Sequence, residues 1–265
     1  MKKILLFFSI ILFLSACTGN QKTYYISMPN FKSTFGEHNN TNANSPKVKI
    51  NDVEIIKNTF YSSYFEQSTL NQRINKSLEL LKKQLLEDSK ALLQSKGYII
   101  DNENPDYAFN IVINASLYED KVTRNSSLGG DSVESSFMII LEAQSHLNNL
   151  HQEDTFQSTT SSAKLNDPII LNYPIKGQAS IESFREVYSA VPTQVNESLA
   201  ASALEIDKVF VAFYKEIASS LKTSIKEIKE EQKTQENSEV QDVKQDDKKE
   251  EKATPYQNNE VIIFE

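Results

Sequence analysis

The sequence predicts an α+β fold in which an antiparallel sheet of four to five strands is covered on one face by two long helices. Two stretches of strand length alternate apolar and polar residues, and two longer stretches repeat apolar residues every three or four positions. The first pattern is typical of a sheet with one buried and one solvated face, and the second of amphipathic helices. These stretches lie within residues 50–228, which we expect to form one domain.

The first helix is predicted after a short apolar strand over residues 53–60. Ser68 and Thr69 can both cap a helix N-terminus. The apolar residues that follow are spaced by 4, 4, 3 and 4 positions: Leu70, Ile74, Leu78, Leu81 and Leu85. Gly97 marks the helix end because glycine tolerates the left-handed backbone that closes many helices. Residues 98–100 then begin another short strand.

The centre of the sheet is predicted from two alternating runs, residues 107–118 and residues 137–147. Each run places apolar side chains on one face and mostly polar ones on the other. The segment between them, 125–131, is rich in Ser and Gly and is expected to be a loop. Residues 155–163, rich in Thr and Ser, predict a polar strand at the sheet edge.

The second helix carries the longest apolar stripe in the chain. Thr193 follows Pro192 and is its predicted N-cap. Ten apolar residues recur at a mean spacing near 3.67: Val195, Leu199, Ala203, Ile206, Phe210, Phe213, Ile217, Leu221, Ile225 and Ile228. This spacing fits an ordinary helix better than a heptad coiled coil, so we expect the stripe to pack on the sheet.

The N-terminus has the pattern of an export signal. Two lysines follow Met1, residues 4–14 are apolar apart from Ser9, and Ala16 stands directly before Cys17, the only cysteine. The apolar run is shorter than the about 20 residues that span a bilayer, but it has the length of a secretory signal. Small residues before a cysteine form a lipobox, and this segment resembles bacterial lipoprotein signals.

That resemblance implies cleavage between Ala16 and Cys17, diacylation of the Cys17 sulfur and acylation of the new N-terminus. The alternative is an ordinary signal peptide with a chance cysteine. Two or more acyl chains hold a protein stably on a bilayer, so we expect a tethered protein with no cofactor other than this covalent lipid. With its thiol blocked, the mature chain can form no disulfide.

Composition divides the chain into four parts. Residues 1–16 form the signal peptide, 17–49 a lipidated flexible tether, 50–228 the α+β domain, and 229–265 a charged tail, partly helical and then disordered. The tether and the tail contain too few apolar residues to offset the entropy of ordering. The apolar end of the tail, residues 261–264, could dock on the domain, bind a partner or fray.

Charge argues against a nucleic-acid partner. The formal net charge is −8, and loss of the two signal lysines lowers it to −10. A negative protein disfavours nucleic acid and anionic lipid surfaces.

Catalytic and metal sites are also not expected. The sequence has no nucleophile elbow, P-loop, dinucleotide-binding glycines or zinc-protease motif, so we predict no catalytic residue and no enzyme activity. His146 and His151, with Glu142, Glu153 and Asp154 nearby in sequence, are candidate metal ligands. Their spacing across a strand and a turn aims no two ligands at one point, so we predict no metal.

The order of these features is similar to the neuraminyllactose-binding hemagglutinin family of epsilonproteobacterial lipoproteins. The shared features are the lipobox, a helix ending in Ser-Lys-Gly-Tyr (95–98), a strand opening with Asp-Tyr-Ala (106–108), a basic segment, and a long helix running into a charged tail. The resemblance implies an outer-membrane or surface lipoprotein with adhesin activity toward sialylated glycans.

The family's basic segment corresponds to residues 118–127 here, which contain Lys121 and Arg124. A sialic acid carboxylate needs a charge-assisted donor, which Arg124 could give and Lys121 could support. Glu119 and Asp120 oppose this, and the two basic residues could equally be solvated loop charges. The alternative function is a periplasm-facing lipoprotein that binds or scaffolds an envelope assembly, so the partner is a host glycan or an envelope protein.

Overall fold

The computed structural model describes residues 22–36, 41–127, 130–152, 156–175 and 191–228, which all belong to one compact unit. The elements in chain order are β1 (Thr23–Tyr25), β2 (Lys47–Ile50), β3 (Glu54–Phe60), α2 (Ser63–Glu66), α3 (Thr69–Ser95), β4 (Ile99–Ile100), β5 (Tyr107–Ser127), β6 (Gly130–Asn149), β7 (Phe156–Lys164), β8 (Ile169–Ile175), β9 (Gln194–Asn196) and α5 (Glu197–Ser224). The fold is α+β, as the sequence predicts.

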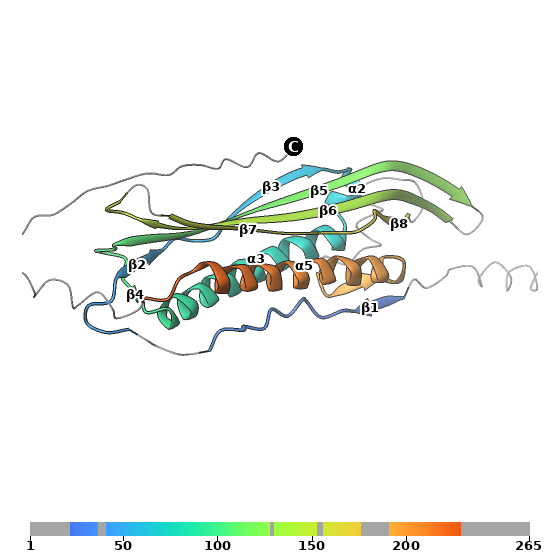
Figure 1. The fold of residues 1–265 in the computed structure, drawn as a ribbon. Coiled ribbons are helices and arrows are strands. Elements are labelled where there is room, and N and C mark those ends of the chain that lie inside the picture. The colour runs from blue at the N-terminus through green and yellow to red at the C-terminus, as the bar shows by residue number, and fades with distance from the viewer. Residues whose placement is uncertain (1–21, 37–40, 128–129, 153–155, 176–190, 229–265) are drawn as a thin grey trace, which may run out of the picture. The chain divides into compact units, whose positions relative to one another are not determined.

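The main sheet has seven strands and is mixed (Figure 1). Its order is β4-β2-β5-β6-β7, while β3 also pairs with β5 and β8 also pairs with β6. Strands β2 and β3 run parallel to β5, and β4 runs parallel to β2; β6 runs antiparallel to β5, β7 and β8. The expectation of four to five antiparallel strands is therefore wrong in both number and direction.

Chain connectivity explains both differences. Helix α3 carries the chain back along the sheet after β3, so β5 enters in the same direction as β3 and the two strands pair in parallel. Strands β2 and β3 pair with successive parts of β5, and β8 and β7 pair with successive parts of β6. Each edge of the long β5–β6 hairpin is thus built from two short strands, and β2 and β8 are strands that the sequence did not predict.

The two long helices cover one face of this sheet, as expected (Figure 1). Helix α3 begins and ends where the sequence predicts. The side chain of its N-cap Ser68 accepts a hydrogen bond from the backbone N–H of Asn71, and Gly97 follows the C-cap with a φ of 92°. Local capping residues therefore determine both ends of α3.

Helix α5 begins later than predicted. Its N-cap is Asn196, whose side chain accepts from the backbone N–H of Ser198, so the prediction of Thr193 as the cap is wrong. The reason is that residues 194–196 form β9 and pair with β1. Val195, the first residue of the predicted stripe, is buried in that strand, and Ile225 lies beyond the last helical residue.

The core lies between the helices and the sheet. The stripe of α5 supplies Phe210 and Phe213, and β6 supplies Phe137, all fully buried. The ring of Phe137 stacks on that of Phe65 from α2, with 4.5 Å between the ring centroids. Burial of such aromatic side chains is a main source of stability in a domain without disulfides.

Residues 22–36 pack on the domain, although composition assigned them to the tether. The fully buried Arg73 of α3 donates hydrogen bonds to the backbone carbonyls of Ile26 (2.9 Å) and Ser27 (2.5 Å). It also donates to both carboxylate oxygens of Asp207 in α5, at 2.9 and 2.5 Å. A buried guanidinium requires hydrogen-bond acceptors. Residues 22–36 supply two of them, and these hydrogen bonds fix the segment to the domain.

Phe31 is likewise buried against Tyr214, with 5.4 Å between the ring centroids. Strand β2 at residues 47–50 belongs to the main sheet, so ordered structure starts before the predicted boundary at residue 50. The signal peptide, residues 17–21 and 37–40 of the predicted tether, and the tail 229–265 lie outside the described residues.

Candidate functional site

The predicted glycan-binding residues lie in a strand rather than in a loop. Strand β5 continues to Ser127 and β6 starts at Gly130, so the expected loop over residues 125–131 belongs mostly to the hairpin. The pairing register shifts between Asp120 and Thr123, and Lys121 there has a φ of 53°. This β-bulge reverses which side chains face the helices, since it adds residues to one strand only.

The bulge places Arg124 on the same face as its buried partner Val133. The Arg124 guanidinium forms a salt bridge with Asp131, and the hydrogen bonds from Arg124 and Ser126 lower the pKa of the Asp131 carboxyl. Arg124 therefore already has a carboxylate partner. Lys121 is exposed at the bulge. In the described residues, Lys121 and Arg124 are not brought together around a cavity.

Glu119, the acidic neighbour of the two basic residues in sequence, is buried on the helix-facing side of β5. Its carboxylate accepts hydrogen bonds from the backbone N–H of Ser62 (2.7 Å), the Ser135 hydroxyl (2.6 Å) and the Tyr173 hydroxyl (3.2 Å). These donors come from the N-cap of α2, from β6 and from β8. Glu119 therefore joins three elements, and its role is structural.

The outer face of the sheet, which carries no long helix, has an apolar patch across four strands. We call it the sheet-face patch; its members are Phe60, Tyr118, Met138, Ile140 and Ile170. In the strand register Phe60 pairs with Tyr118, and Tyr118 pairs with Met138, so three large side chains form one row across the strands. Paired residues lie on the same face of a sheet.

The patch is open to solvent to an unusual degree. Phe60 is 70% exposed, Ile170 59% and Tyr118 44%. Large apolar side chains gathered on one face, in contrast to scattered single ones, mark interaction surfaces. The described residues hold no other group of exposed aromatic and aliphatic side chains across adjacent strands of the main sheet.

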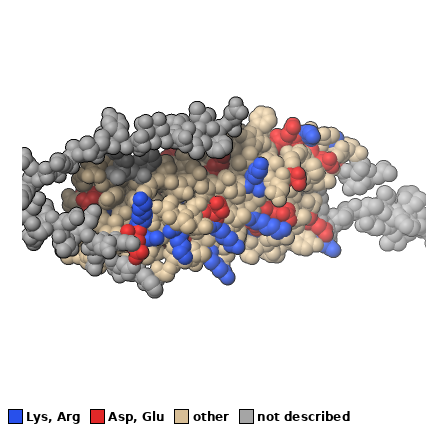
Figure 2. Space-filling view, viewed as in Figure 1, with Lys and Arg blue, Asp and Glu red and all other residues tan. Residues whose placement is uncertain are grey.

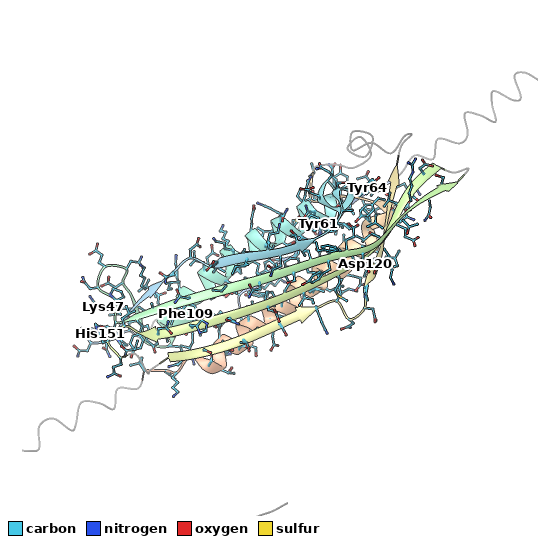
Figure 3. All side chains as sticks on the ribbon, turned by 90° about the horizontal axis from the view of Figure 1, so that it is seen from above. Lys47, Tyr61, Tyr64, Phe109, Asp120 and His151 are labelled. Atoms are coloured by element: carbon cyan, nitrogen blue, oxygen red, sulfur yellow. The ribbon has the colours of Figure 1, made fainter. Side chains whose placement is uncertain are left out.

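The rim of the patch is acidic. Figure 3 looks onto this face and labels Asp120, which follows Tyr118 on the same side of β5. Glu54, Glu134 and Glu142 occupy further exposed positions on this face, and the basic residue Lys164 pairs with Ile140. The side of the domain that bears α5 differs, because Figure 2 shows Lys and Arg there interspersed with Asp and Glu.

Only part of this surface could be found in the sequence. Tyr118, Met138 and Ile140 fall at polar-face positions of the alternating runs, which was a usable signal. Phe60 and Ile170 could not be added, because their membership depends on which strands pair.

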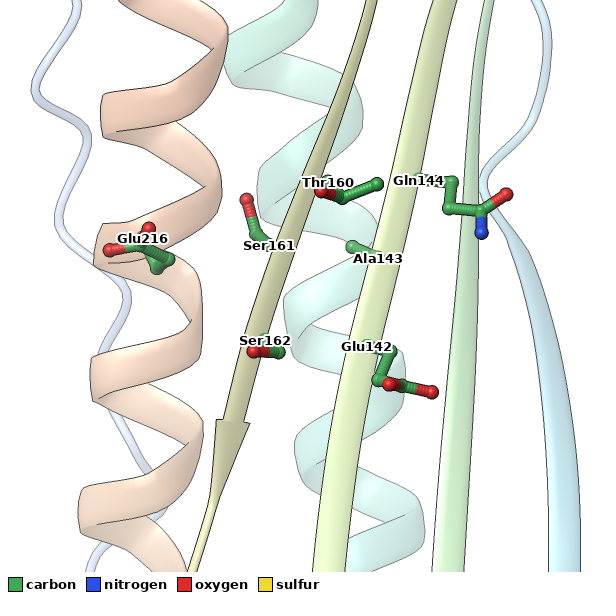
Figure 4. Close-up of a pocket in the computed structure, with 7 residues that line it drawn as sticks. All are labelled: Glu142, Ala143, Gln144, Thr160, Ser161, Ser162 and Glu216. Carbon is green, nitrogen blue, oxygen red and sulfur yellow. The ribbon is translucent and has the colours of Figure 1, made fainter. Parts of the chain in front are cut away.

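A polar hollow of about 290 Å³ lies at the β7 edge of the sheet, between β6, β7 and α5. Figure 4 shows Glu142 of β6 and Glu216 of α5 on opposite sides of β7, pointing away from each other. The two carboxylates therefore cannot share a proton or a metal ion. Ser161 lies between them, with its hydroxyl 3.1 Å from that of Ser220.

The histidines form no ligand cluster in the described residues. His151 is exposed and its Nε2 lies 3.4 Å from the Asp106 carboxylate, while His146 pairs with Asn110 across the hairpin. No group of three or more His, Cys, Asp or Glu side chains suited to a metal ion occurs among these residues. Glu153 and Asp154 lie outside the described residues.

The N-terminus matches a known site. Residues 1–18 match the model of the prokaryotic membrane lipoprotein lipid attachment site. The chain is thus a membrane lipoprotein, anchored by lipid. Ala16 and Cys17 lie within the matched segment and outside the described residues. Among the helices that the structure describes, none is long and apolar enough to cross a membrane.

Comparisons beyond this segment give weak similarities. No curated protein matches the sequence. A solved structure described as a neuraminyllactose-binding hemagglutinin homolog from Helicobacter pylori is 14% identical with a TM-score of 0.37, covering 73% of this chain and 91% of that one.

Two further structures are more distant. A minor lipoprotein from Acinetobacter baumannii is 9% identical with a TM-score of 0.25, covering 68% of this chain and 94% of its own. A Xanthomonas campestris protein of the DUF330 family is 9% identical with a TM-score of 0.24, covering 76% and 99%. Because all three TM-scores are below 0.5, these similarities carry no functional conclusion.

Proposed function

We propose that this lipoprotein is a non-enzymatic envelope protein that binds a protein partner through its sheet-face patch. The observation that supports this most is the row formed by Phe60, Tyr118 and Met138, in which an exposed aromatic pair crosses adjacent strands. Aromatic side chains on a rigid sheet give a large contact area at low entropic cost, and they are enriched at protein interfaces.

The rim defines the chemistry of the partner. Asp120, Glu134 and Glu142 surround apolar residues, so the complementary surface has an apolar centre flanked by lysines or arginines. Opposite charges at a rim mainly raise the association rate and exclude wrong partners. An acidic rim disfavours nucleic acid.

The test is co-purification of the lipidated protein from its native membrane in a mild detergent. The Phe60→Ser/Tyr118→Ser double variant should lose the partner, because both apolar contacts are removed without touching the core. Leu150→Ser is the matched control, since Leu150 is also an exposed apolar residue but lies outside the patch. A partner that stays bound to the double variant, or leaves with the control, would contradict the proposal.

The lipid is proposed to be on Cys17, with cleavage after Ala16. Cys17 is the only cysteine of the chain and lies within the matched attachment site. Acyl chains supply about 0.8 kcal/mol per buried CH₂, enough for stable anchoring when two or more are present. Cys17→Ala should incorporate no labelled palmitate and leave the membrane fraction. Unchanged labelling of this variant would rule out the assignment.

A second candidate function is the sialoglycan binding that the sequence resemblance implies, with the outer-membrane surface as its location. It is favoured by the exposure of Lys121 in the bulge and of Arg124 shortly after it. It requires Arg124 to exchange Asp131 for a glycan carboxylate. A glycan array with wild type and Arg124→Ala tests it: sialoglycan signals that the substitution abolishes support this function, and the absence of any such signal contradicts it.

A further inference from the structure

The first strand of the domain begins very close to the lipid attachment site. Six peptide steps join Cys17 to Thr23, and an extended chain spans at most about 3.3–3.6 Å per residue, so β1 lies within roughly 20 Å of the acylated residue. The tether expected from composition was some thirty residues longer. A short connection keeps one end of the domain beside the bilayer.

Strand β1 is held firmly at that end. Tyr24 pairs with Val195 of β9 in a two-stranded antiparallel sheet. On either side of this pair, the backbone N–H of Ile26 donates to the Thr193 carbonyl and that of Glu197 donates to the Lys22 carbonyl, both at 2.9 Å. The buried Arg73 adds its hydrogen bond to the Ile26 carbonyl. Movement of β1 toward the bilayer therefore moves the whole domain.

Two adjacent tyrosines on β1 are exposed on opposite faces of the strand, because Tyr24 pairs with the buried Val195 and Tyr25 pairs with Gln194. Tyr25 is 78% exposed and Tyr24 is 44% exposed. The Tyr24 hydroxyl donates to the Glu197 carboxylate at 3.2 Å, and the Gln194 amide donates to the Tyr25 hydroxyl at 3.3 Å. Residues of β9 and α5 thus orient the two hydroxyls, while the ring of Tyr25 is mostly exposed to solvent. An apolar ring with a polar tip is the side chain that favours the membrane interface.

We propose that Tyr25, on the face of β1 opposite the buried Val195, forms a second membrane contact, which rests in the headgroup layer beside the lipid anchor. The contact is weak by itself, but the short connection makes it an intramolecular event with a high effective concentration. The end of the domain where α5 begins then faces the bilayer, and the end with β2 and β4 points away from it (Figure 1). This inference rests on lipid attachment at Cys17 and not on the sheet-face partner.

The chain contains no tryptophan, which allows a direct test. Tyr25→Trp introduces a single tryptophan at the proposed contact, and Leu150→Trp introduces one at an exposed apolar position beside the start of β5, at the other end of the domain. Both lipidated full-length proteins are reconstituted in phosphatidylcholine–phosphatidylethanolamine vesicles, with lipidation checked by mass. Lipids brominated in the upper acyl chain quench tryptophan only at short range.

The expected result is a blue-shifted emission and strong quenching for Tyr25→Trp, and neither change for Leu150→Trp. Equal quenching of the two variants would overturn the proposal. A third protein, Tyr24→Ser in the Tyr25→Trp background, should be quenched as strongly, because Tyr24 lies on the opposite face of β1. Circular dichroism confirms that each variant is folded. Because the vesicles contain no other protein, the outcome is independent of any sheet-face partner.

Discussion

Glu119 and Asp120 are neighbours in sequence whose side chains lie on opposite faces of β5. The Glu119 carboxylate is buried and accepts from Ser62, Ser135 and Tyr173, whereas Asp120 is exposed on the outer face. Glu119→Ala should lower the free energy of unfolding by about 1–3 kcal/mol, because buried donors lose their acceptor. Urea denaturation measures this difference.

Asp120→Ala is the matched control and should change stability by less than about 0.5 kcal/mol, as exposed substitutions usually do. Equal midpoints for the two variants would show that Glu119 does not join the three elements. The predicted alternation ends at residue 118, so it did not include Glu119, and the partners of Glu119 are 16 to 57 residues away in sequence. Neither the burial of Glu119 nor its role was therefore predicted from the sequence.

At the scale of single elements, the α5 stripe is the clearest prediction. Phe210 is fully buried at its centre. Phe210→Asp places an unpaired charge in the core and should cost several kcal/mol of unfolding free energy. Thermal melting followed by circular dichroism is sufficient to detect this. A variant that melted like wild type would show that the stripe does not contribute to the core.

The ion pair between β2 and the end of β4 gives a pH prediction. Hydrogen bonding from Lys47, at 2.8 Å, and from the backbone N–H groups of Glu103 and Asn104 lowers the pKa of Asp101 to about 2. A carboxyl whose folded-state pKa is lowered stabilises the fold above its ordinary value of 3.8, and this contribution is lost as the pH falls through about 2.

The stability difference between wild type and Asp101→Asn should therefore shrink as the pH falls from 6 toward about 2. Titration of the Asp101 carboxyl by NMR checks the same point directly. A titration midpoint near 3.8 would mean that the ion pair does not persist in solution.

Elements differ in how far local sequence determines them. The ends of α3 were predictable because Ser68 and Gly97 act within one helical turn. Strands β1 and β9 were not, since three residues carry no detectable period and each exists only because the other pairs with it. The parallel pairing of β3 and β5 follows from the intervening helix, a rule about connections that residue patterns alone do not express.

At the scale of the whole molecule, the lipid attachment site and the sheet-face patch have different roles. Lipid brings the chain to a membrane, and the patch supplies the contact surface that we assign to a protein partner. The glycan hypothesis assumed that Lys121 and Arg124 lie in a loop. In the structure both lie in strand β5, and Arg124 forms a salt bridge with Asp131.

Photo-cross-linking from the patch tests the central claim most directly. A photoreactive phenylalanine derivative at position 60, in the full-length lipoprotein on native membranes, should form an adduct with one other protein. The cross-linked peptide should carry apolar residues flanked by lysine or arginine, and Asp120→Lys should weaken the adduct. The same probe at Leu150 should form none. An adduct with residues 229–265 of this chain, with a second copy, or with nothing at all would contradict the claim.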